Sequence, residues 1–389
     1  MHVRNRVHVR VRTACAALVV LGLTAGPLAG TALAAPSPTT VVREADGPNR
    51  KALCAALAGL PDKDATAALV RVGGTDGSWR GRAGVHDLVS NRKALEHARF
   101  RAGSTTKVVT AAVVLSLAAD GLIDLDGHVQ TYLPGLLSDD FKKPITVRQL
   151  LTFTSGLKPG ATLGEVNGEG YERRFETLTP EEVVASSVAQ GPEFDPGERQ
   201  QYANIDYTVL GLLIEKVTGD SYEDQAALRV LRPAKMHHTS FPGGPDPRIH
   251  GPHNRGYQKL ADGRLVDATE WNMSDRWAAG DMISTTADLE RLLFALFRGE
   301  LVPQPLLEKE MFTLPDVPNA TMSAGLQRYD AGDGTVLWLK SGARPGYSTG
   351  LAATRDLSRT LVYSVNATDA KAVAPNPVVE RILRATFGL

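Results

Sequence analysis

Apolar residues recur at helical intervals in several stretches of the chain. These stretches are residues 51–60, 108–119, 146–151, 180–189, 206–217 and 378–387. In the fifth of them, Val209, Leu213 and Val217 fall on one face, which predicts an amphipathic helix. The second is apolar on nearly every side, which predicts a helix buried in the core.

Runs of alternating or β-branched apolar residues, typical of strands, cluster near the two ends of the chain. They are residues 66–72, 78–85, 335–339, 348–354 and 360–366. The first two are joined by a glycine-rich turn at 73–77, which is a hairpin signal. Strand signals are sparse between residues 120 and 285, where residues 243–263 are expected to form a loop.

This order predicts an α/β fold in which both ends of the chain build one sheet. Residues 48–105 and 286–389 would form an α/β part, an antiparallel sheet flanked by the two terminal helices. Residues 106–285 would form an all-helical part packed against that sheet. A site is expected at the junction, because clefts between subregions often hold ligands.

The first 35 residues have the three parts of a secretory signal peptide. Four arginines precede an apolar run from about residue 14 to 28, and residues 32–35 (Ala-Leu-Ala-Ala) supply an A-x-A cleavage pattern. Glycine and proline interrupt the apolar run, which is short for a bilayer span. We therefore expect a cleaved signal at 1–35, a flexible tail at 36–47, and a secreted protein with no stable membrane anchor.

Charge and cysteine content narrow the possible partners. The chain has 43 basic and 43 acidic side chains, and the predicted signal carries four of the basic ones and none of the acidic ones. The remainder is slightly acidic and has no basic face that would suggest nucleic acid. After cleavage Cys54 would be the single cysteine, so no disulfide within the chain is expected, and Cys54 is predicted to be a small buried residue.

A candidate nucleophile lies directly before the apolar helix at 108–119. Ser104 follows Ala102-Gly103 and would stand at the helix N-terminus, where unpaired N–H groups and the helix dipole favour a developing oxyanion. Lys107 lies on the same face about one turn later. A hydroxyl and an ammonium on one face can activate a nucleophile. The alternative is an N-cap serine and a solvated lysine.

A second candidate pair, Tyr202 and Asn204, precedes the helix at 206–217. Side chains two residues apart in an extended segment project in the same direction. Tyr202 could relay a proton if nearby ammonium groups lowered its pKa, and Asn204 could hydrogen-bond a substrate amide. The alternative is a partly buried tyrosine and a turn asparagine.

A third candidate group, Lys340-Ser341-Gly342, follows the strand at 335–339. Lys340 could attract a substrate carboxylate and Ser341 could hydrogen-bond it. Gly342 would let another backbone or a ligand approach closely. An edge-strand lysine that discourages aggregation is the alternative.

The chain lacks the sequence motifs of metal sites, phosphate-binding loops and Ser-His-Asp hydrolases. The chain contains no H-E-x-x-H metal motif, no cysteine cluster, no phosphate-binding G-x-x-x-x-G-K-[ST] loop and no G-x-S-x-G elbow. Neither a metal nor another cofactor is therefore expected.

Taken in order, S-x-x-K, Y-x-N and K-[ST]-G resemble the signature of penicillin-binding proteins and β-lactamases. The Y-x-N form is similar to that of class C β-lactamases and of secreted D-alanyl-D-alanine carboxypeptidases of Gram-positive bacteria. The likeness extends over most of residues 65–370 and includes Tyr132-Leu133-Pro134-Gly135, residues 146–157, residues 279–293 and residues 346–350.

The resemblance implies a role for each motif. Ser104 would be the acylated nucleophile, and Lys107 and Tyr202 would shuttle its proton, with the identity of the base left open. The backbone N–H groups of Ser104 and Ala343 would form the oxyanion hole. Asn204 would position the substrate.

The third motif would bind the substrate carboxylate through Lys340 and Ser341, with Gly342 beside them. Some carboxypeptidase relatives have histidine in place of this lysine, and some use an additional arginine, for which Arg328 and Arg344 are candidates. Phe153 stands where many relatives carry histidine. It lies outside the three motifs and is assigned no role.

The resemblance implies a serine-type D-alanyl-D-alanine carboxypeptidase that acts on peptidoglycan stem peptides as a monomer, through an acyl-enzyme. A class C-like β-lactamase, a D-aminopeptidase or an esterase would share the acylation machinery, and β-lactams would be alternative ligands. A penicillin-binding sensor that acylates without turnover is the non-enzymatic alternative.

Overall fold

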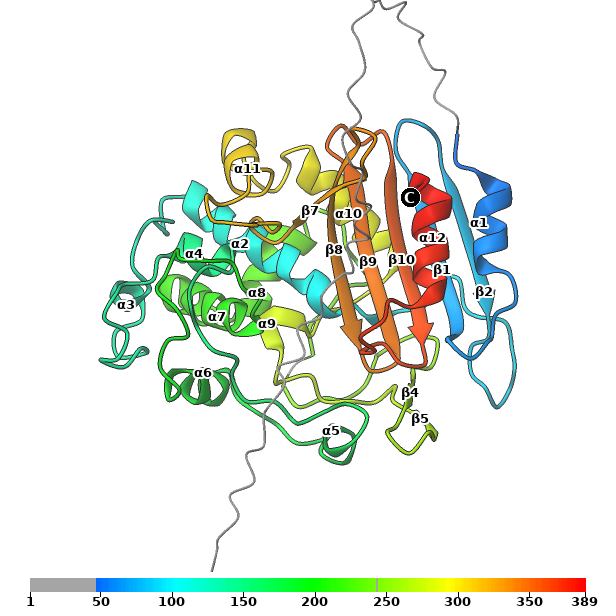
Figure 1. Cartoon of the computed structure of the whole chain (residues 1–389), viewed down its shortest axis with the longest axis horizontal. Coiled ribbons are helices and arrows are strands. Elements are labelled where there is room, and N and C mark those ends of the chain that lie inside the picture. Colours follow the sequence, from blue (N-terminus) through cyan, green and yellow to red (C-terminus); the bar gives the residue numbers. More distant parts are fainter. Residues whose placement is uncertain (1–46, 243) are drawn as a thin grey trace, which may run out of the picture.

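The computed structural model describes residues 47–242 and 244–389. The predicted signal peptide, residues 1–35, and residues 36–46 of the predicted tail lie outside the described residues. Within them, six antiparallel strands form the main sheet in the order β2-β1-β10-β9-β8-β7 (Figure 1). These strands are β1 (Ala65–Gly73), β2 (Trp79–Gly84), β7 (Gln327–Asp330), β8 (Val336–Arg344), β9 (Tyr347–Thr354) and β10 (Thr360–Ala367).

The sheet is built by both ends of the chain. β1 pairs with β10 from Ala65 opposite Ala367 to Gly73 opposite Thr360, so the first and last strands of the sequence lie side by side within it. The predicted α/β fold with an antiparallel sheet is therefore confirmed.

The third motif lies inside a strand rather than after one. The pattern predicted a strand that ends at residue 339, but β8 continues to Arg344 and pairs with β9 along this length. β7 pairs with β8 only as far as Leu339. The edge of β8 beyond Leu339 instead packs against the short 3₁₀ turn η1 (Gly103–Thr105), which contains Ser104.

The terminal helices α1 (Arg50–Leu57) and α12 (Pro377–Phe387) cover one face of the sheet. Leu53, Leu57 and Ile382 are buried there in one cluster with residues of β1 and β10. Cys54 lies on the outer side of α1 and is exposed. The prediction that it is buried was wrong, because residues four apart, here Leu53 and Leu57, face the sheet and the next position does not.

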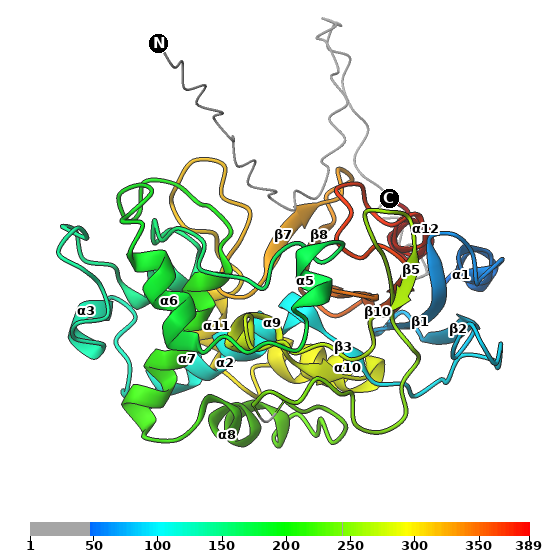
Figure 2. The same ribbon diagram turned by 90° about the horizontal axis from the view of Figure 1, so that it is seen from below.

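The other face of the sheet carries α10 (Thr286–Phe297), which packs on β1, β9 and β10 (Figure 2). The helical part lies beside the sheet and centres on α2 (Thr106–Ala119), of whose 14 residues eleven are buried. The remaining helices are α3 (Val129–Tyr132), α4 (Val147–Leu151), α5 (Glu169–Glu172), α6 (Pro180–Val188), α7 (Asn204–Thr218), α8 (Tyr222–Ala226), η2 (Ala227–Leu231), α9 (Trp277–Gly280) and α11 (Gln304–Glu310).

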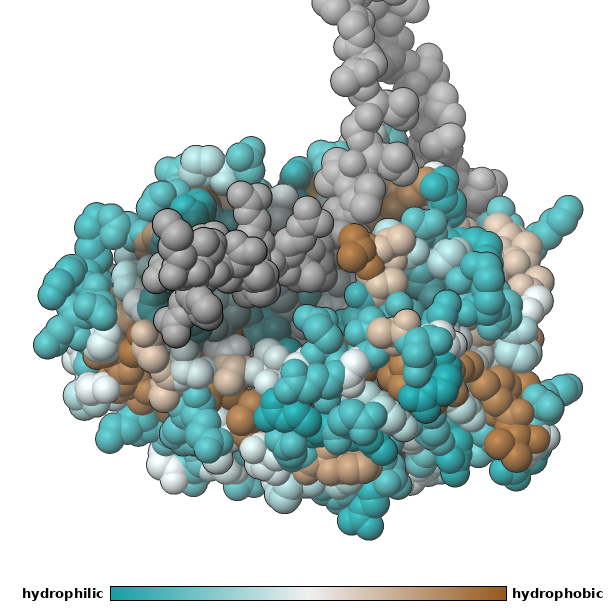
Figure 3. Space-filling view, turned by 60° about the horizontal axis from the view of Figure 1, so that its bottom comes forward, coloured by the Kyte–Doolittle hydropathy of each residue, from teal (hydrophilic) through white to brown (hydrophobic). Residues whose placement is uncertain are grey.

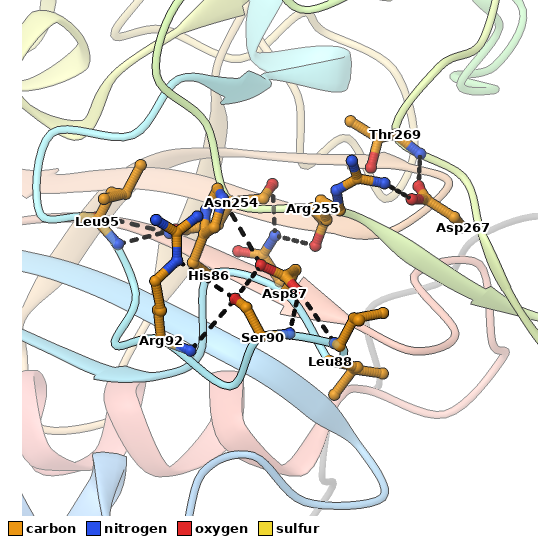
Figure 4. Close-up of polar contacts among 12 residues, drawn as sticks. His86, Asp87, Leu88, Ser90, Arg92, Leu95, Asn254, Arg255, Asp267 and Thr269 are labelled. Atoms are coloured by element: carbon orange, nitrogen blue, oxygen red, sulfur yellow. Dashed lines mark hydrogen bonds and ion pairs between the residues drawn. The ribbon is translucent and has the colours of Figure 1, made fainter.

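Part of the expected loop at 243–263 is a strand. β4 (Tyr257–Lys259) pairs with β5 (Leu265–Asp267) in a small hairpin whose strands, three residues each, are too short to show a strand pattern. Figure 4 shows that Asn254 Oδ1 accepts the backbone N–H of Leu95, in the loop after β2. Within the region itself, Arg255 pairs with Asp267. The hairpin and its flanks thus form a fixed part of the domain.

The surface is mainly polar. Hydrophilic residues predominate on the face shown in Figure 3, and hydrophobic residues form scattered groups among them. In the part of the chain that the structure describes, no helix is long and apolar enough to cross a membrane.

Candidate active site

Ser104 protrudes from an otherwise buried segment. It follows β3 (Phe100–Arg101), which pairs with β6 (Ile283–Ser284), and it lies in the turn η1 that leads into α2. Ser104 is the one partly exposed residue of the described stretch 100–115. The hydroxyl groups of Thr105 and Thr106 donate to the carbonyl oxygens of Ala102 and Gly103, which fixes the turn.

The third motif packs directly on this turn. A Cβ atom at Gly342 would lie 2.0 Å from the carbonyl oxygen of Ala102 and 3.0 Å from the nitrogen of Ser104. A Cβ at Gly103 would likewise lie 2.6 Å from the nitrogen of Ala343. Only glycine permits two backbones to approach so closely. The structure thus brings the nitrogens of Ser104 and Ala343 together, as two oxyanion-hole donors require.

Tyr202 reaches Ser104 from the helical part. Its hydroxyl donates to Ser104 Oγ at 2.8 Å. Ala203 is extended (φ −138°, ψ 135°) and α7 begins at Asn204, so Tyr202 and Asn204 both turn toward the nucleophile, as the spacing predicted. The two side chains meet Ser104 and Lys107, respectively.

The expected lowering of the Tyr202 pKa was wrong. Burial raises the pKa of Tyr202 to about 12, and this effect outweighs the opposing hydrogen bond to Ser104 and the charges of Arg344 and Arg276. The amines of Lys107 and Lys340 each lie 5.0 Å from the centroid of its ring. A raised pKa favours the protonated phenol, in agreement with the hydrogen bond that Tyr202 donates to Ser104 Oγ.

Lys107 is fully buried and lies below the nucleophile. Its Nζ donates to Asn204 Oδ1 at 2.7 Å and to the carbonyl oxygen of Ala279 at 2.6 Å, and it lies 3.4 Å from Ser104 Oγ. Burial, followed by the nearby charge of Lys340, holds the pKa of Lys107 well below its usual range. A lowered pKa favours the neutral form of the amine.

This geometry suits a neutral amine acting as a base. A neutral amine has two N–H groups and one lone pair. As an ammonium, Lys107 can donate to all three neighbours, Asn204 Oδ1, the Ala279 carbonyl and Ser104 Oγ. Once the amine is neutral, the two short contacts would take both N–H groups and leave the lone pair for Ser104 Oγ. The arrangement favours Lys107 as the base that accepts the Ser104 proton. Asn204 orients Lys107 through its Oδ1, a contact that the sequence did not predict.

Lys340 projects from β8 beside Tyr202. It is 8% exposed, donates to the carbonyl oxygen of Ser341 at 2.9 Å, and has a pKa that burial lowers to about 8. Ser341 is half-buried on the same strand. These two residues border the nucleophile turn, where a substrate carboxylate could be held.

The two candidate arginines differ in their placement. Arg344 is buried and donates Nε–H to the carbonyl oxygen of Gly280 at 2.9 Å, so it braces β8 against α9. Arg328 on β7 lies opposite Trp338 of β8, is partly exposed, and lies 3.6 Å from Asp330. Arg328 is therefore the freer of the two to meet a ligand.

Two contributors to the site have no motif of their own. The carbonyl of Ala279 is a backbone group, which any residue could provide. The one sequence signal for it was the family resemblance of residues 279–293. Phe153, which was assigned no role, packs its ring 4.8 Å from Tyr202 and 5.2 Å from Tyr207. The aromatic residue in place of the usual histidine was a signal that could have found it.

Comparison with known proteins agrees with this geometry. The Beta-lactamase family matches residues 53–383. PbpX of Bacillus subtilis, whose name describes it as a candidate penicillin-binding protein, is 28% identical over 253 residues, 64% of this chain and 57% of PbpX. Protein flp of Staphylococcus aureus is 29% identical over 209 residues, 53% of this chain and 40% of flp. The chain thus spans about half the length of these curated relatives.

Solved structures match over more of their length. A D-stereospecific amidohydrolase from Streptomyces sp. has a TM-score of 0.76 and 30% identity, covering 87% of this chain and 98% of that one. A D-amino acid amidase from Ochrobactrum anthropi has a TM-score of 0.71 over 86% and 98% of the two chains, and its 24% identity shows the fold alone. The chain therefore belongs to the β-lactamase family, and it is a serine hydrolase of the type that includes penicillin-binding proteins.

Proposed function

We propose that this protein is a secreted serine-type D-alanyl-D-alanine carboxypeptidase that acts on peptidoglycan stem peptides through an acyl-enzyme at Ser104. The observation that carries the proposal is the excess of positive charge around Ser104 and Tyr202. This charge suits a substrate that ends in a carboxylate.

The cations around the site outnumber its ionised acids. Lys340 and Arg344 come from β8, and Arg276 precedes α9; all three act on the pKa of Lys107. Burial raises the pKa values of the two buried acids nearby, Asp206 and Asp281, well above the usual range, which favours their neutral forms. A third acid, Asp275, pairs with Arg276 at 3.5 Å. A carboxylate is attracted to such a site, whereas the ammonium of a free amino terminus is repelled.

Acylation follows from the contacts of Ser104. Lys107 accepts the hydroxyl proton as Oγ attacks the substrate carbonyl, and the N–H groups of Ser104 and Ala343 stabilise the oxyanion. The C–N bond then breaks. Tyr202, whose hydroxyl is hydrogen-bonded to Ser104 Oγ, passes a proton to the departing amine and regains one from Lys107. Water finally attacks the ester, which releases the shortened peptide and restores Ser104.

D-Stereospecific amide hydrolysis is a second candidate, favoured by the 30% identity to the Streptomyces amidohydrolase. Such an activity would use the same nucleophile and base. The two candidates differ in the group beyond the scissile bond, which is a D-amino acid carboxylate for the carboxypeptidase and can be uncharged for an amidase. The charged surroundings of Tyr202 support the first.

A matched pair of peptides separates the candidates. The secreted protein is incubated with diacyl-Lys-D-Ala-D-Ala and with the same peptide ending in D-Ala amide, and kcat/KM is measured for each. We expect cleavage that favours the free carboxylate by about tenfold or more, as one charge pair can provide. Equal rates, or a preference for the amide, would overturn the proposal in favour of amide hydrolysis.

Two further substrates test the remaining alternatives. Rapid turnover of a chromogenic cephalosporin without release of D-Ala would indicate a β-lactamase. Stable labelling by a fluorescent penicillin with no turnover of any substrate would indicate a sensor. Ser104→Ala is the control and is expected to abolish labelling and hydrolysis together. Secretion is tested by N-terminal sequencing of the protein from culture medium, with a start near Pro36 expected.

A further inference from the structure

Three consecutive backbone carbonyls of α9 hold three separate side chains of the site. We call residues 278–280 the carbonyl strap. The oxygen of Ala278 accepts from Thr110 Oγ1 at 2.6 Å, that of Ala279 from Lys107 Nζ at 2.6 Å, and that of Gly280 from Arg344 Nε at 2.9 Å. The strap therefore connects α2, which carries Lys107, to β8, which carries the third motif.

Trp277 precedes the strap and has an unusual backbone. Its φ angle is +30°, a region that bulky residues rarely occupy. Its indole N–H donates to Glu223 Oε1 on α8 at 2.7 Å, and its ring packs edge-on against Tyr222 at 5.4 Å. A Cβ atom at Gly211 on α7 would lie 2.6 Å from the ring, so α7 also presses against it. Strained backbone persists where the surroundings hold it in place.

We propose that Trp277 is a positioning residue for Lys107, because its hydrogen bond to Glu223 holds the carbonyl strap where Ala279 accepts one of the two N–H groups of the amine. Asn204 accepts another N–H, so a neutral amine would have its lone pair left for Ser104 Oγ, 3.4 Å away. This inference rests on the proposed function only in so far as Lys107 takes part in acylation of Ser104.

Loosening the strap would change the surroundings of Lys107. Water that replaces the Ala279 carbonyl hydrates the amine and favours its charged form. The other groups that face Lys107 would be unchanged in a Trp277 or Glu223 variant. They are Tyr202, Asp206 and Tyr207 on the side of α7, Lys340 and Arg344 on β8, Arg276 before α9, and Lys371 after β10.

The test uses Trp277→Phe, which keeps a ring but loses the N–H, and Glu223→Ala, which removes the acceptor. Glu223→Gln retains an acceptor oxygen and is the conservative variant. Trp79→Phe is the matched control, since the indole N–H of Trp79 on β2 has no hydrogen-bond partner among the described residues. Each protein is labelled with ¹³Cε-lysine, and the Lys107 signal, assigned by its loss in Lys107→Arg, is followed as a function of pH.

We expect the midpoint of the Lys107 titration to rise by about one unit in Trp277→Phe and in Glu223→Ala, an amount typical of partial hydration of a buried amine. The double variant should shift no further than either single variant, because both remove the same bond. Glu223→Gln and Trp79→Phe should titrate like the parent. Labelling by fluorescent penicillin near pH 7 should slow about tenfold in the shifted variants.

An unchanged Lys107 titration in both Trp277→Phe and Glu223→Ala would overturn the inference, even if both proteins melt at lower temperature. The titration does not depend on the substrate. Failure of the parent protein to release D-Ala would count against the proposed function alone. If Trp277→Phe does not fold, the Lys107 titrations of Glu223→Ala and Glu223→Gln test the inference instead.

Discussion

Lys107 Nζ lies 2.7 Å from Asn204 Oδ1, so the first and second motifs meet in a direct hydrogen bond. The contact joins residues 97 positions apart. Together with the carbonyl of Ala279, it would take both N–H groups of a neutral amine and leave the lone pair for Ser104 Oγ, 3.4 Å away. This arrangement favours Lys107 as the base, a choice that the sequence left open, and burial raises the pKa of Tyr202.

A carboxylate at position 204 should disable this base at neutral pH. Asn204→Asp keeps the size of the side chain and its acceptor but places a negative charge beside Lys107. An opposite charge at this range favours the ammonium by about 1–3 pKa units. We expect the acid limb of penicillin acylation to move to higher pH by that amount. The rate near pH 7 should fall about 10- to 1000-fold and recover in alkaline solution.

Stopped-flow acylation between pH 5 and 10 measures this shift. Asn91→Asp, on the exposed loop after β2, is the control for the added charge and should leave the profile in place. An Asn204→Asp profile with the acid limb of the parent would mean that Lys107 is not the base.

Lys340 should impose an alkaline limb that depends on the charge of the substrate. Burial lowers its pKa to about 8, so it loses its proton as pH rises through that value. Binding of a peptide carboxylate should weaken above pH 8, because the ammonium that attracts it is gone. We expect kcat/KM for diacyl-Lys-D-Ala-D-Ala to fall there, while an uncharged ester substrate shows no such fall. A limb shared by both substrates would assign it to another group.

Much of the fold was predictable because it depends on local patterns. Alternation identified the strands at both ends, and helical spacing identified the long helices. The three motifs could be placed because each needs particular side chains next to an element that orients them. Ser104 before α2 and Tyr202 before α7 are the two clearest cases, since the adjacent apolar helices were readable.

The predictions that were wrong concern features that depend on tertiary surroundings. The sign of the Tyr202 pKa shift was wrong because two ammonium groups were counted and burial was not. The prediction that Cys54 is buried was wrong because Leu53 and Leu57 determine which face of α1 packs on the sheet. The hairpin at β4 was missed because each of its strands is only three residues long. The Ala279 carbonyl had no side chain by which it could be recognised.

Phe153 should matter through its contact with Tyr202. Its ring is buried between Tyr202 and Tyr207, and its carbonyl accepts the N–H of Gln201, directly before Tyr202. Phe153→Leu removes the ring contacts, which are worth about 0.5–1.5 kcal/mol each beyond their buried area. We expect a loss of about 1–3 kcal/mol in unfolding free energy, and acylation about tenfold slower because Tyr202 gains freedom.

Phe312→Leu is the matched control for this prediction. Phe312 packs on Phe297 at 4.9 Å and Trp338 at 5.3 Å, but not on Tyr202. It should lose similar stability in urea unfolding while acylating Ser104 at nearly the parent rate. Equal slowing in both variants would show that general loosening, rather than the position of Tyr202, sets the rate.

Asp206 should make the protein less stable as pH rises. It is 1% exposed, and burial raises its pKa well above the usual range, although Ser155 Oγ donates to it at 2.5 Å. Above the usual pKa of an aspartate, about 4, the unfolded chain has released this proton and the folded chain has not. The unfolded state then binds fewer protons, so stability falls with pH up to the raised pKa.

Asp206→Asn removes this dependence, because an amide does not ionise in either state. We expect the unfolding free energy of Asp206→Asn, minus that of the parent, to increase as pH rises above about 4, measured by urea unfolding at each pH. Asp126→Asn is the control, because its unfolding free energy relative to the parent should change with pH in the opposite direction. The pKa of Asp126 is lowered by its hydrogen bonds to Arg148, so its ionised form stabilises the fold above pH 4. The stability of Asp126→Asn should be closest to that of the parent in acid and lower than that of the parent near neutral pH. Parallel pH curves for Asp206→Asn and the parent would show that Asp206 is ionised in the folded protein.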